Sequence, residues 1–217
     1  MKKILLSFAM LSLLLASCKK EETKTVTTDI EKDSIAPVEE TTTAAPLDSA
    51  TMQKAWEQYM TPGEPHQMFA KDEGTWAEEA TMYMSANDQN PQKWKMTAVT
   101  KMILGGRYQE SRHSGNVMGQ PFEGVSIMGY DNASKKIVST WYDNMGTRIM
   151  YVSGDYNPNS DTVELRGEMT DPMTGKKKPY RETFRVVDND TRHIVMYDVD
   201  EKGSEYKSME ITMKRKK

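Results

Sequence analysis

The chain has 217 residues, of which 37% are hydrophobic and 28% are charged, and its formal net charge at pH 7 is −3. A single cysteine excludes a disulfide framework and a four-cysteine zinc site, and three histidines leave little material for a histidine-rich metal centre. The slight excess of acidic residues argues against a protein that binds nucleic acid by neutralising phosphates. We therefore expect no metal site and no nucleic-acid partner.

The first residues have the form of a secretory signal. A basic start is followed by an apolar run from Ile4 to Leu15, which is shorter than the roughly 20 residues that a transmembrane helix needs. Leu15-Ala16-Ser17-Cys18 resembles a bacterial lipobox, in which the cysteine is acylated and becomes the mature N-terminus. The resemblance implies a signal peptide at 1–17, a membrane anchor at Cys18, and a place in the bacterial cell envelope, on either face of the outer membrane. An ordinary secretory signal with a chance cysteine is the alternative.

A polar segment follows the cysteine. Residues 19–50 contain no aromatic residue and hold eight acidic residues and seven threonines. Such a composition cannot bury enough apolar surface to offset the entropy that folding removes. We predict that 18–50 is a lipidated cysteine with a disordered tether, and that 51–217 is a single folded domain.

Apolar residues at helical spacing mark the start of that domain: Met52, Ala55, Trp56, Tyr59 and Met60. Asp48 or Ser49 can cap a helix here, and 61–63 ends it. We expect this apolar face to pack on a core. A second helical turn starting at 64–66 would direct Met68 and Phe69 inward.

From Gly74 onward the apolar period changes from helical to two. Residues 94–102 and 162–169 alternate apolar and polar side chains, which is typical of strands with one wet face. Turn signals rich in Gly, Pro, Asn and Asp separate the segments. The pattern predicts an all-β fold, an antiparallel meander of about nine or ten strands that closes into a barrel or forms a sandwich.

Several segments carry a family resemblance. Gly74-Thr75-Trp76 resembles the Gly-x-Trp motif of the calycin barrels, the lipocalins and their relatives, in which the tryptophan plugs the closed end. Residues that resemble a bacterial family known as domain of unknown function 1579 occur at 101–108, 118–124, 129–132, 138–147, 171–176 and 207–211. The resemblance covers about 52–217 and implies a calycin-like β-barrel with Gly74 and Trp76 as structural residues of its base. It carries no known activity.

Motifs for common chemistries are missing. The sequence has no Gly-x-Ser-x-Gly elbow, no His-Glu-x-x-His, no P-loop and no Gly-x-Gly-x-x-Gly. The carboxylate pairs Glu78/Glu79 and Asp188/Asp190 are expected at an exposed strand start and in a turn. We therefore predict no catalytic residues.

The histidines offer two further readings. A Ser-His-Asp set could be assembled only in space, from His113 or His193. One inward histidine could ligate haem, as in the nitrobindin-like barrels, but nothing around the three histidines marks an axial ligand. We expect no cofactor.

Two strands, 107–113 and 180–185, are polar on both faces. Either one face of each points into the barrel, or both strands lie at an exposed rim and are solvated. The 18 methionines are open to three interpretations: Cu(I) ligands, an adaptable ligand pocket, or ordinary core. We predict a cavity with an apolar wall and a polar patch that includes Gln109, Tyr130, Trp141 and Arg181.

These features favour a membrane-anchored envelope lipoprotein whose barrel binds a small hydrophobic or amphipathic ligand without a covalent bond. One alternative is a structural or protein-interaction module with a filled barrel. The other is an uncharacterised enzyme that uses polar barrel residues.

Overall fold

The computed structural model describes residues 48–217, which form two helices and ten strands. The helices are α1 (Ser49–Met60) and α2 (Glu64–Ala70). The strands are β1 (Gly74–Met82), β2 (Gln92–Ile103), β3 (Tyr108–Val117), β4 (Gln120–Asp131), β5 (Lys136–Asp143), β6 (Met150–Asn157), β7 (Thr162–Thr170), β8 (Lys177–Asp188), β9 (Thr191–Val199) and β10 (Glu205–Arg215). The predicted signal peptide at 1–17, the lipidation site Cys18 and the tether as far as residue 47 lie outside the described residues.

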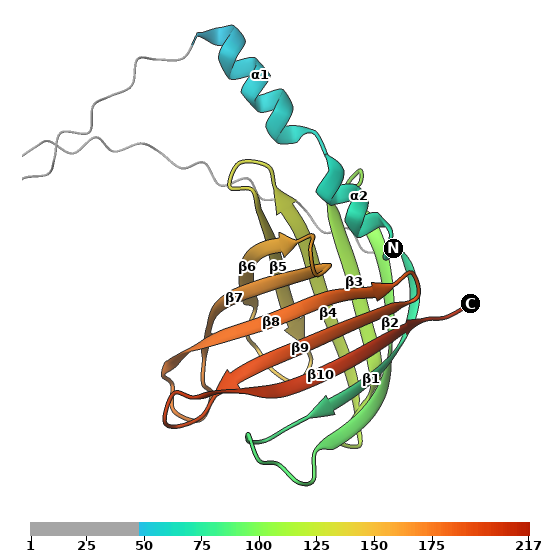
Figure 1. Cartoon of the computed structure of the whole chain (residues 1–217), viewed down its shortest axis with the longest axis vertical. Helices are drawn as coiled ribbons and strands as arrows, with labels where there is room; N and C mark the ends of the chain where they lie inside the picture. The colour runs from blue at the N-terminus through green and yellow to red at the C-terminus, as the bar shows by residue number, and fades with distance from the viewer. Residues whose placement is uncertain (1–47) are drawn as a thin grey trace, which may run out of the picture. The chain divides into compact units, whose positions relative to one another are not determined.

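Each strand pairs antiparallel with the next, and β1 also pairs with β10, which closes the sheet into a barrel (Figure 1). The prediction of an antiparallel barrel preceded by a short helix is confirmed, and the sandwich alternative is wrong. Closure leaves no free sheet edge among the ten strands of residues 48–217, so each of them has a partner on both sides.

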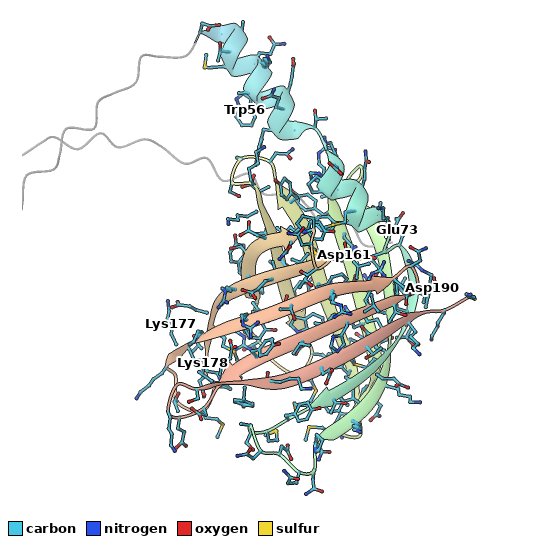
Figure 2. All side chains as sticks on the ribbon, in the orientation of Figure 1. Trp56, Glu73, Asp161, Lys177, Lys178 and Asp190 are labelled. Carbon is cyan, nitrogen blue, oxygen red and sulfur yellow. The ribbon has the colours of Figure 1, made fainter. Side chains whose placement is uncertain are left out.

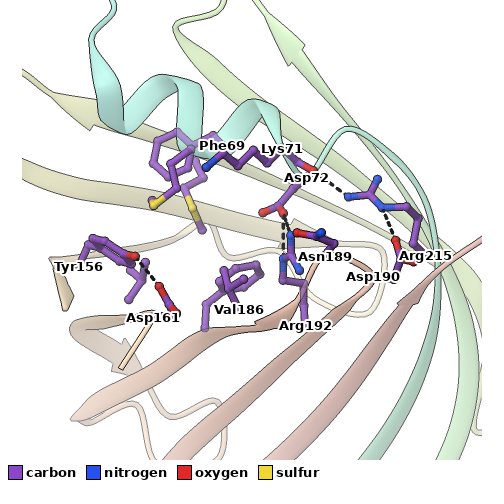
Figure 3. Close-up of a pocket in the computed structure, with 14 residues that line it drawn as sticks. Phe69, Lys71, Asp72, Tyr156, Asp161, Val186, Asn189, Asp190, Arg192 and Arg215 are labelled. Carbon is purple, nitrogen blue, oxygen red and sulfur yellow. Dashed lines mark hydrogen bonds and ion pairs between the residues drawn. The ribbon is translucent and has the colours of Figure 1, made fainter. Parts of the chain in front are cut away.

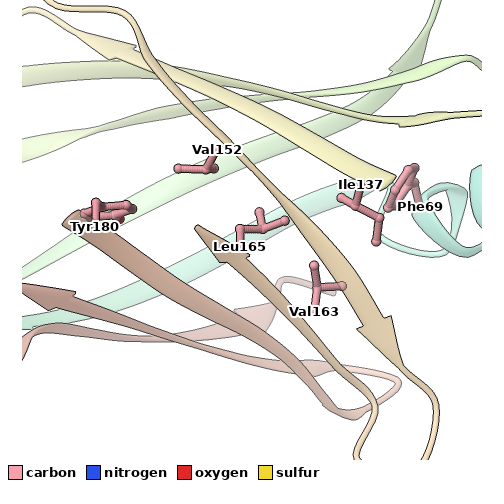
Figure 4. Close-up of a cluster of buried hydrophobic side chains, with 6 residues drawn as sticks. All are labelled: Phe69, Ile137, Val152, Val163, Leu165 and Tyr180. Atoms are coloured by element: carbon pink, nitrogen blue, oxygen red, sulfur yellow. The ribbon is translucent and has the colours of Figure 1, made fainter. Parts of the chain in front are cut away.

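The alternation of side chains divides each strand between the lumen and the outer surface. In β2, Ala98 and Thr100 are buried, whereas Val99 and Lys101 between and beside them are exposed. One apolar cluster on the inner face contains Phe69, Ile137, Val152, Val163, Leu165 and Tyr180 (Figure 4). A second contains Trp76, Ala80, Ala98, Ile211 and Met213. The core therefore consists of two apolar walls that face the lumen.

Helix α1 forms as predicted, and the carboxylate of Asp48 caps it by accepting from the amides of Ala50 and Thr51 at 3.0 Å each. The expected packing of its apolar face on a core is wrong, because none of its residues is buried and Trp56 is 61% exposed (Figure 2). The helix is held instead through carbonyls at its C-terminal end, three of which accept from the side-chain amide of Asn132. Such polar contacts do not cover the apolar face. Within 48–217, no helix combines the length and the hydrophobicity needed to span a bilayer.

Helix α2 covers one end of the barrel. Phe69 points inward as predicted, is 2% exposed, and belongs to the first apolar cluster. Its carbonyl accepts a hydrogen bond from Nε2 of Gln109 at 2.9 Å, so an inward side chain of β3 ties α2 to the barrel.

Trp76 lies buried at the same end. It is 1% exposed, and its indole nitrogen donates to the carbonyl of Asp72 at 2.9 Å. The guanidinium groups of Arg215 and Arg192 lie 4.2 and 5.1 Å from the centre of its ring. Gly74 has a φ of +133°, and a Cβ there would lie 2.9 Å from Nη1 of Arg215, so glycine permits both this backbone shape and the approach of the arginine.

Candidate functional site

The lumen is only partly filled. Small residues occupy many of its inward positions: Ala80, Ala98, Ser111, Gly124, Ser126, Ser139, Gly154 and Gly167. Partly exposed methionines on the same face are Met96, Met102, Met128, Met150, Met169, Met196 and Met209. Because these thioethers point into the barrel and still contact solvent, space remains between the walls for water or a small molecule.

A pocket of about 440 Å³ opens between α2 and the neighbouring rim of the barrel (Figure 3). Its apolar side chains are Met68, Phe69, Met128, Val163, Phe184 and Val186. Its polar side chains are Lys71, Asp72, Tyr156, Asp161, Asn189, Asp190, Arg192 and Arg215. The pocket therefore combines an apolar wall with a polar rim.

The charges at this pocket are largely paired with one another. Arg192 donates from Nε and Nη2 to Oδ1 of Asp72 at 2.8 and 2.6 Å, and Nε of Arg215 lies 3.4 Å from Asp190. Burial raises the pKa of Asp72 above its ordinary value, and the adjacent Arg192 partly offsets that shift. A ligand that covers these groups would not strand a buried charge, because each already has a partner.

A second polar cluster lies deeper in the lumen. The side chain of Glu78 is fully buried, and both its carboxylate oxygens lie 3.1 Å from Nδ1 of His113. The expectation that Glu78 lies on a solvated face is wrong, because its position two residues from both Trp76 and Ala80 places it on their buried inner face. Within 48–217, no group of three or more His, Cys, Asp or Glu side chains is arranged to hold a metal ion.

A third polar pair joins neighbouring inward positions of β8. The hydroxyl of Tyr180 donates to Oε2 of Glu182 at 2.8 Å. Burial raises the pKa of Glu182 and holds the pKa of Tyr180 well above its ordinary value. The native state therefore favours the neutral form of Glu182 more strongly than the unfolded chain does.

This raised pKa gives a pH-dependent stability. Since the native state retains the Glu182 proton to higher pH than the unfolded chain, ionisation reduces stability as the pH rises above the ordinary value of 4.5. We expect Glu182→Gln, which has no ionisable group but can still accept from Tyr180, to gain free energy of unfolding relative to the wild type between about pH 5 and pH 8. Urea unfolding at both pH values measures the difference. Parallel pH profiles for the two proteins would contradict it.

The four predicted binding residues do not form one site, and none of them lines the pocket beside α2. Gln109 faces inward and is used to hold α2, whereas Tyr130 packs edge-on against His66 at 6.0 Å between ring centres. Trp141 also faces inward, next to His113, at 5.0 Å between ring centres.

Arg181 lies on the outer surface, so the expectation that it belongs to an inner polar patch is wrong. It donates from Nε and Nη2 to the carboxylate of Glu205 at 2.9 and 2.5 Å, and it lies 3.5 Å over the ring of Tyr197. Tyr180 and Glu182 occupy the inward positions of this strand, so the alternation directs Arg181 outward.

Asp72 and Arg192 were not predicted from the sequence, and Glu78 was expected on a solvated face. A signal existed for two of them, because Arg192 shares its strand face with Ile194 and Met196, and Glu78 shares its face with Trp76. A charged residue within an inward apolar stripe indicates a buried ion pair. No comparable pattern identifies Asp72, which follows α2 in the chain and contacts Arg192 only in the folded protein.

Comparisons with known proteins concern the family and the fold. The model of a family described as "Protein of unknown function (DUF1579)" matches residues 61–215, and no curated protein matches the chain. The crystal structure of Rv2717c from M. tuberculosis is similar, with a TM-score of 0.54 and 14% identity over 72% of this chain and 100% of that chain. A redesigned beta barrel, b11L5F_LGL, gives a TM-score of 0.35 and 13% identity over 69% of this chain and 95% of that chain. The likeness to Rv2717c supports the barrel fold alone.

Proposed function

We propose a function for this chain, which belongs to the DUF1579 family of proteins of unknown function. The barrel binds a small amphipathic molecule non-covalently in the pocket beside α2. The observation that carries the proposal is the pocket of about 440 Å³ with its apolar wall and polar rim. Pockets for small molecules commonly have volumes of roughly 300–1,000 Å³, and the volume of this pocket falls within that range.

The two sides of the pocket suggest how such a ligand is oriented. Its apolar part would contact Phe69, Val163 and Phe184, where each Å² removed from water contributes roughly 25 cal/mol. Its polar part would face the rim, where the exposed Lys71 makes no ion pair with residues 48–217. Met68 and Met128 add flexible, polarisable surface that adapts to ligand shape.

Filling the pocket tests the proposal. We expect Met68→Trp, which places an indole in the space between α2 and the rim, to weaken binding of 8-anilinonaphthalene-1-sulfonate at least about tenfold, a loss of about 1.4 kcal/mol. Isothermal titration calorimetry measures the affinity. Met173→Trp is the matched control, because Met173 is 91% exposed and lies outside the pocket. Equal affinities for both variants and the wild type would contradict the proposal.

A lipid anchor at Cys18 is the second part of the proposal and is supported by Leu15-Ala16-Ser17-Cys18 alone. Each buried CH₂ of an acyl chain contributes about 0.8 kcal/mol to membrane binding, so two or more chains would hold the protein stably. We expect cells to incorporate an alkyne-palmitate label into the wild type but not into Cys18→Ala, which would also leave the membrane fraction. An unlabelled wild-type protein would contradict the anchor.

A further inference from the structure

His113 presents an unused ring nitrogen to the lumen. Its side chain is only 10% exposed, and its Nδ1 is occupied by the carboxylate of Glu78. Its Nε2 has no hydrogen-bond partner within residues 48–217. In that range, every fully buried side-chain nitrogen or oxygen has a hydrogen-bond partner. Because Nε2 has none, it is not fully buried, and it is accessible from the lumen.

Glu78 fixes the orientation of this ring. The carboxylate is fully buried, and His113 is its one hydrogen-bond partner in the described part of the chain. A carboxylate that holds one ring nitrogen directs the other outward and leaves the ring little freedom to turn. A group that binds at Nε2 would therefore meet a preorganised partner.

An aromatic wall stands beside the histidine. The ring of Trp141 lies 5.0 Å from that of His113 at an angle of 63°, and Phe122 stacks on Trp141 at 6.3 Å. Trp141 is itself held, because its Nε1 donates to Asp143 at 2.7 Å and a Cβ at Gly124 would lie 2.6 Å from its ring. The inward neighbours in register are small, Ala98 opposite His113 and Ser126 opposite Trp141.

From this arrangement we infer that the lumen contains a second binding site, where His113 Nε2 exchanges a hydrogen bond with the hydroxyl of a planar aromatic ligand that lies against Trp141. A hydroxyl fits because it both donates and accepts, so it pairs with Nε2 in either protonation state of the ring. A planar ring fits because aromatic faces and edges attract one another. Neither His113 nor Trp141 lines the pocket beside α2. His113 lies opposite Gly124, which is four residues, roughly 13 Å along β4, from Met128 in that pocket, so the hydrogen-bonding group of this site is distinct from it.

The test uses the full chain and two probes that differ in one group, 2-naphthol and 2-methylnaphthalene. His113→Phe alone would leave Glu78 buried without a partner, so the test variant also replaces the carboxylate: Glu78→Met with His113→Phe. The matched control is Glu210→Met with His193→Phe, which removes a histidine–glutamate pair of 2.7 Å whose side chains are both 31% exposed. In Glu78→Gln the amide oxygen still accepts from Nδ1, so this variant tests rescue by a neutral group.

We expect the test variant to bind 2-naphthol about 3- to 10-fold more weakly and 2-methylnaphthalene within about twofold of the wild type. Neither the control nor Glu78→Gln should change 2-naphthol affinity by more than about threefold. In the unmodified protein, 2-naphthol should also shift the ¹⁵N resonance of His113 Nε2 more than 2-methylnaphthalene does, which tests the site without a variant.

Equal weakening of both probes, or an unshifted Nε2 resonance, would overturn the inference. Failure of both probes to bind, together with normal binding of 8-anilinonaphthalene-1-sulfonate beside α2, would overturn the second site and leave the proposed function standing. If the test variant lost affinity for 2-naphthol alone, and the wild type did not bind 8-anilinonaphthalene-1-sulfonate, the site at His113 would be supported. The proposed binding in the pocket beside α2 would then be contradicted.

Discussion

Replacing Arg192 with methionine is expected to lower the free energy of unfolding by about 3–5 kcal/mol. Arg192 is 3% exposed and donates two hydrogen bonds to Asp72, and its guanidinium also donates to the carbonyls of Asp188 and Thr191. Methionine would keep much of the apolar volume of the arginine side chain. It would, however, leave the Asp72 carboxylate inside the protein without its positively charged partner. Breaking a buried pair on one side costs more than the pair contributes, because the remaining charge is uncompensated.

Thermal unfolding measures this effect. For a domain of this size, each kcal/mol corresponds to about 2–4 °C in Tm, so the expected fall is about 6–20 °C. Lys136→Met is the matched control, because the Lys136–Asp155 pair has a similar distance of 2.7 Å but side chains that are 48% and 68% exposed. Its loss should cost at most about 1 kcal/mol.

A double variant separates two causes of the lost stability: the uncompensated charge of Asp72 and the loss of the other Arg192 contacts. If the uncompensated carboxylate dominates, Asp72→Leu combined with Arg192→Met should recover much of the stability that Arg192→Met loses. A loss below about 1 kcal/mol in the single variant would show that solvent reaches Asp72 well enough to replace the arginine.

The strands could be predicted because their pattern is local. Alternation over 94–102 and 162–169 depends on one wet face and one buried face, and β2 and β7 follow it. Closure could not be derived in the same way, because it depends on the pairing of Trp76 with Arg215 across the whole domain. The family resemblance, rather than periodicity, distinguished a barrel from a sandwich.

The polar residues of the lumen were harder to assign for a physical reason. Where both faces of a strand are polar, as around Arg181, alternation separates two sets of residues without showing which set points inward. The orientation of β8 is fixed by its neighbours, since Glu182 lies opposite Leu165, which is 0% exposed. Likewise, Asp72 and Arg192 are separated by 120 residues, so their contact depends on the closed barrel.

Substituting alanine for Gly154 should cost about 3 kcal/mol of stability, although it adds a single methyl group. Gly154 lies in β6 between Ile137 of β5 and Leu165 of β7. A Cβ at this position would lie 1.8 Å from the carbonyl oxygen of Glu164 and 3.1 Å from Cα of Leu165. Because these are backbone atoms of a paired strand, no side-chain rotation can relieve the overlap, and the two strands must move apart.

The separation of the strands would also change the pocket beside α2. Tyr156 and Val163 lie opposite each other, two residues from Gly154 and Leu165 respectively, and both line this pocket. We therefore expect Gly154→Ala to lower stability in urea unfolding and to weaken binding of 8-anilinonaphthalene-1-sulfonate in the same protein. Gly146→Ala is the control, because the nearest atom to its Cβ would be Oδ1 of Asp143 at 3.9 Å, an ordinary contact, and its effect should stay within about 0.5 kcal/mol. Wild-type stability in Gly154→Ala would mean that β6 and β7 can separate without losing their pairing, and the close approach at Gly154 would then not determine the shape of this side of the barrel.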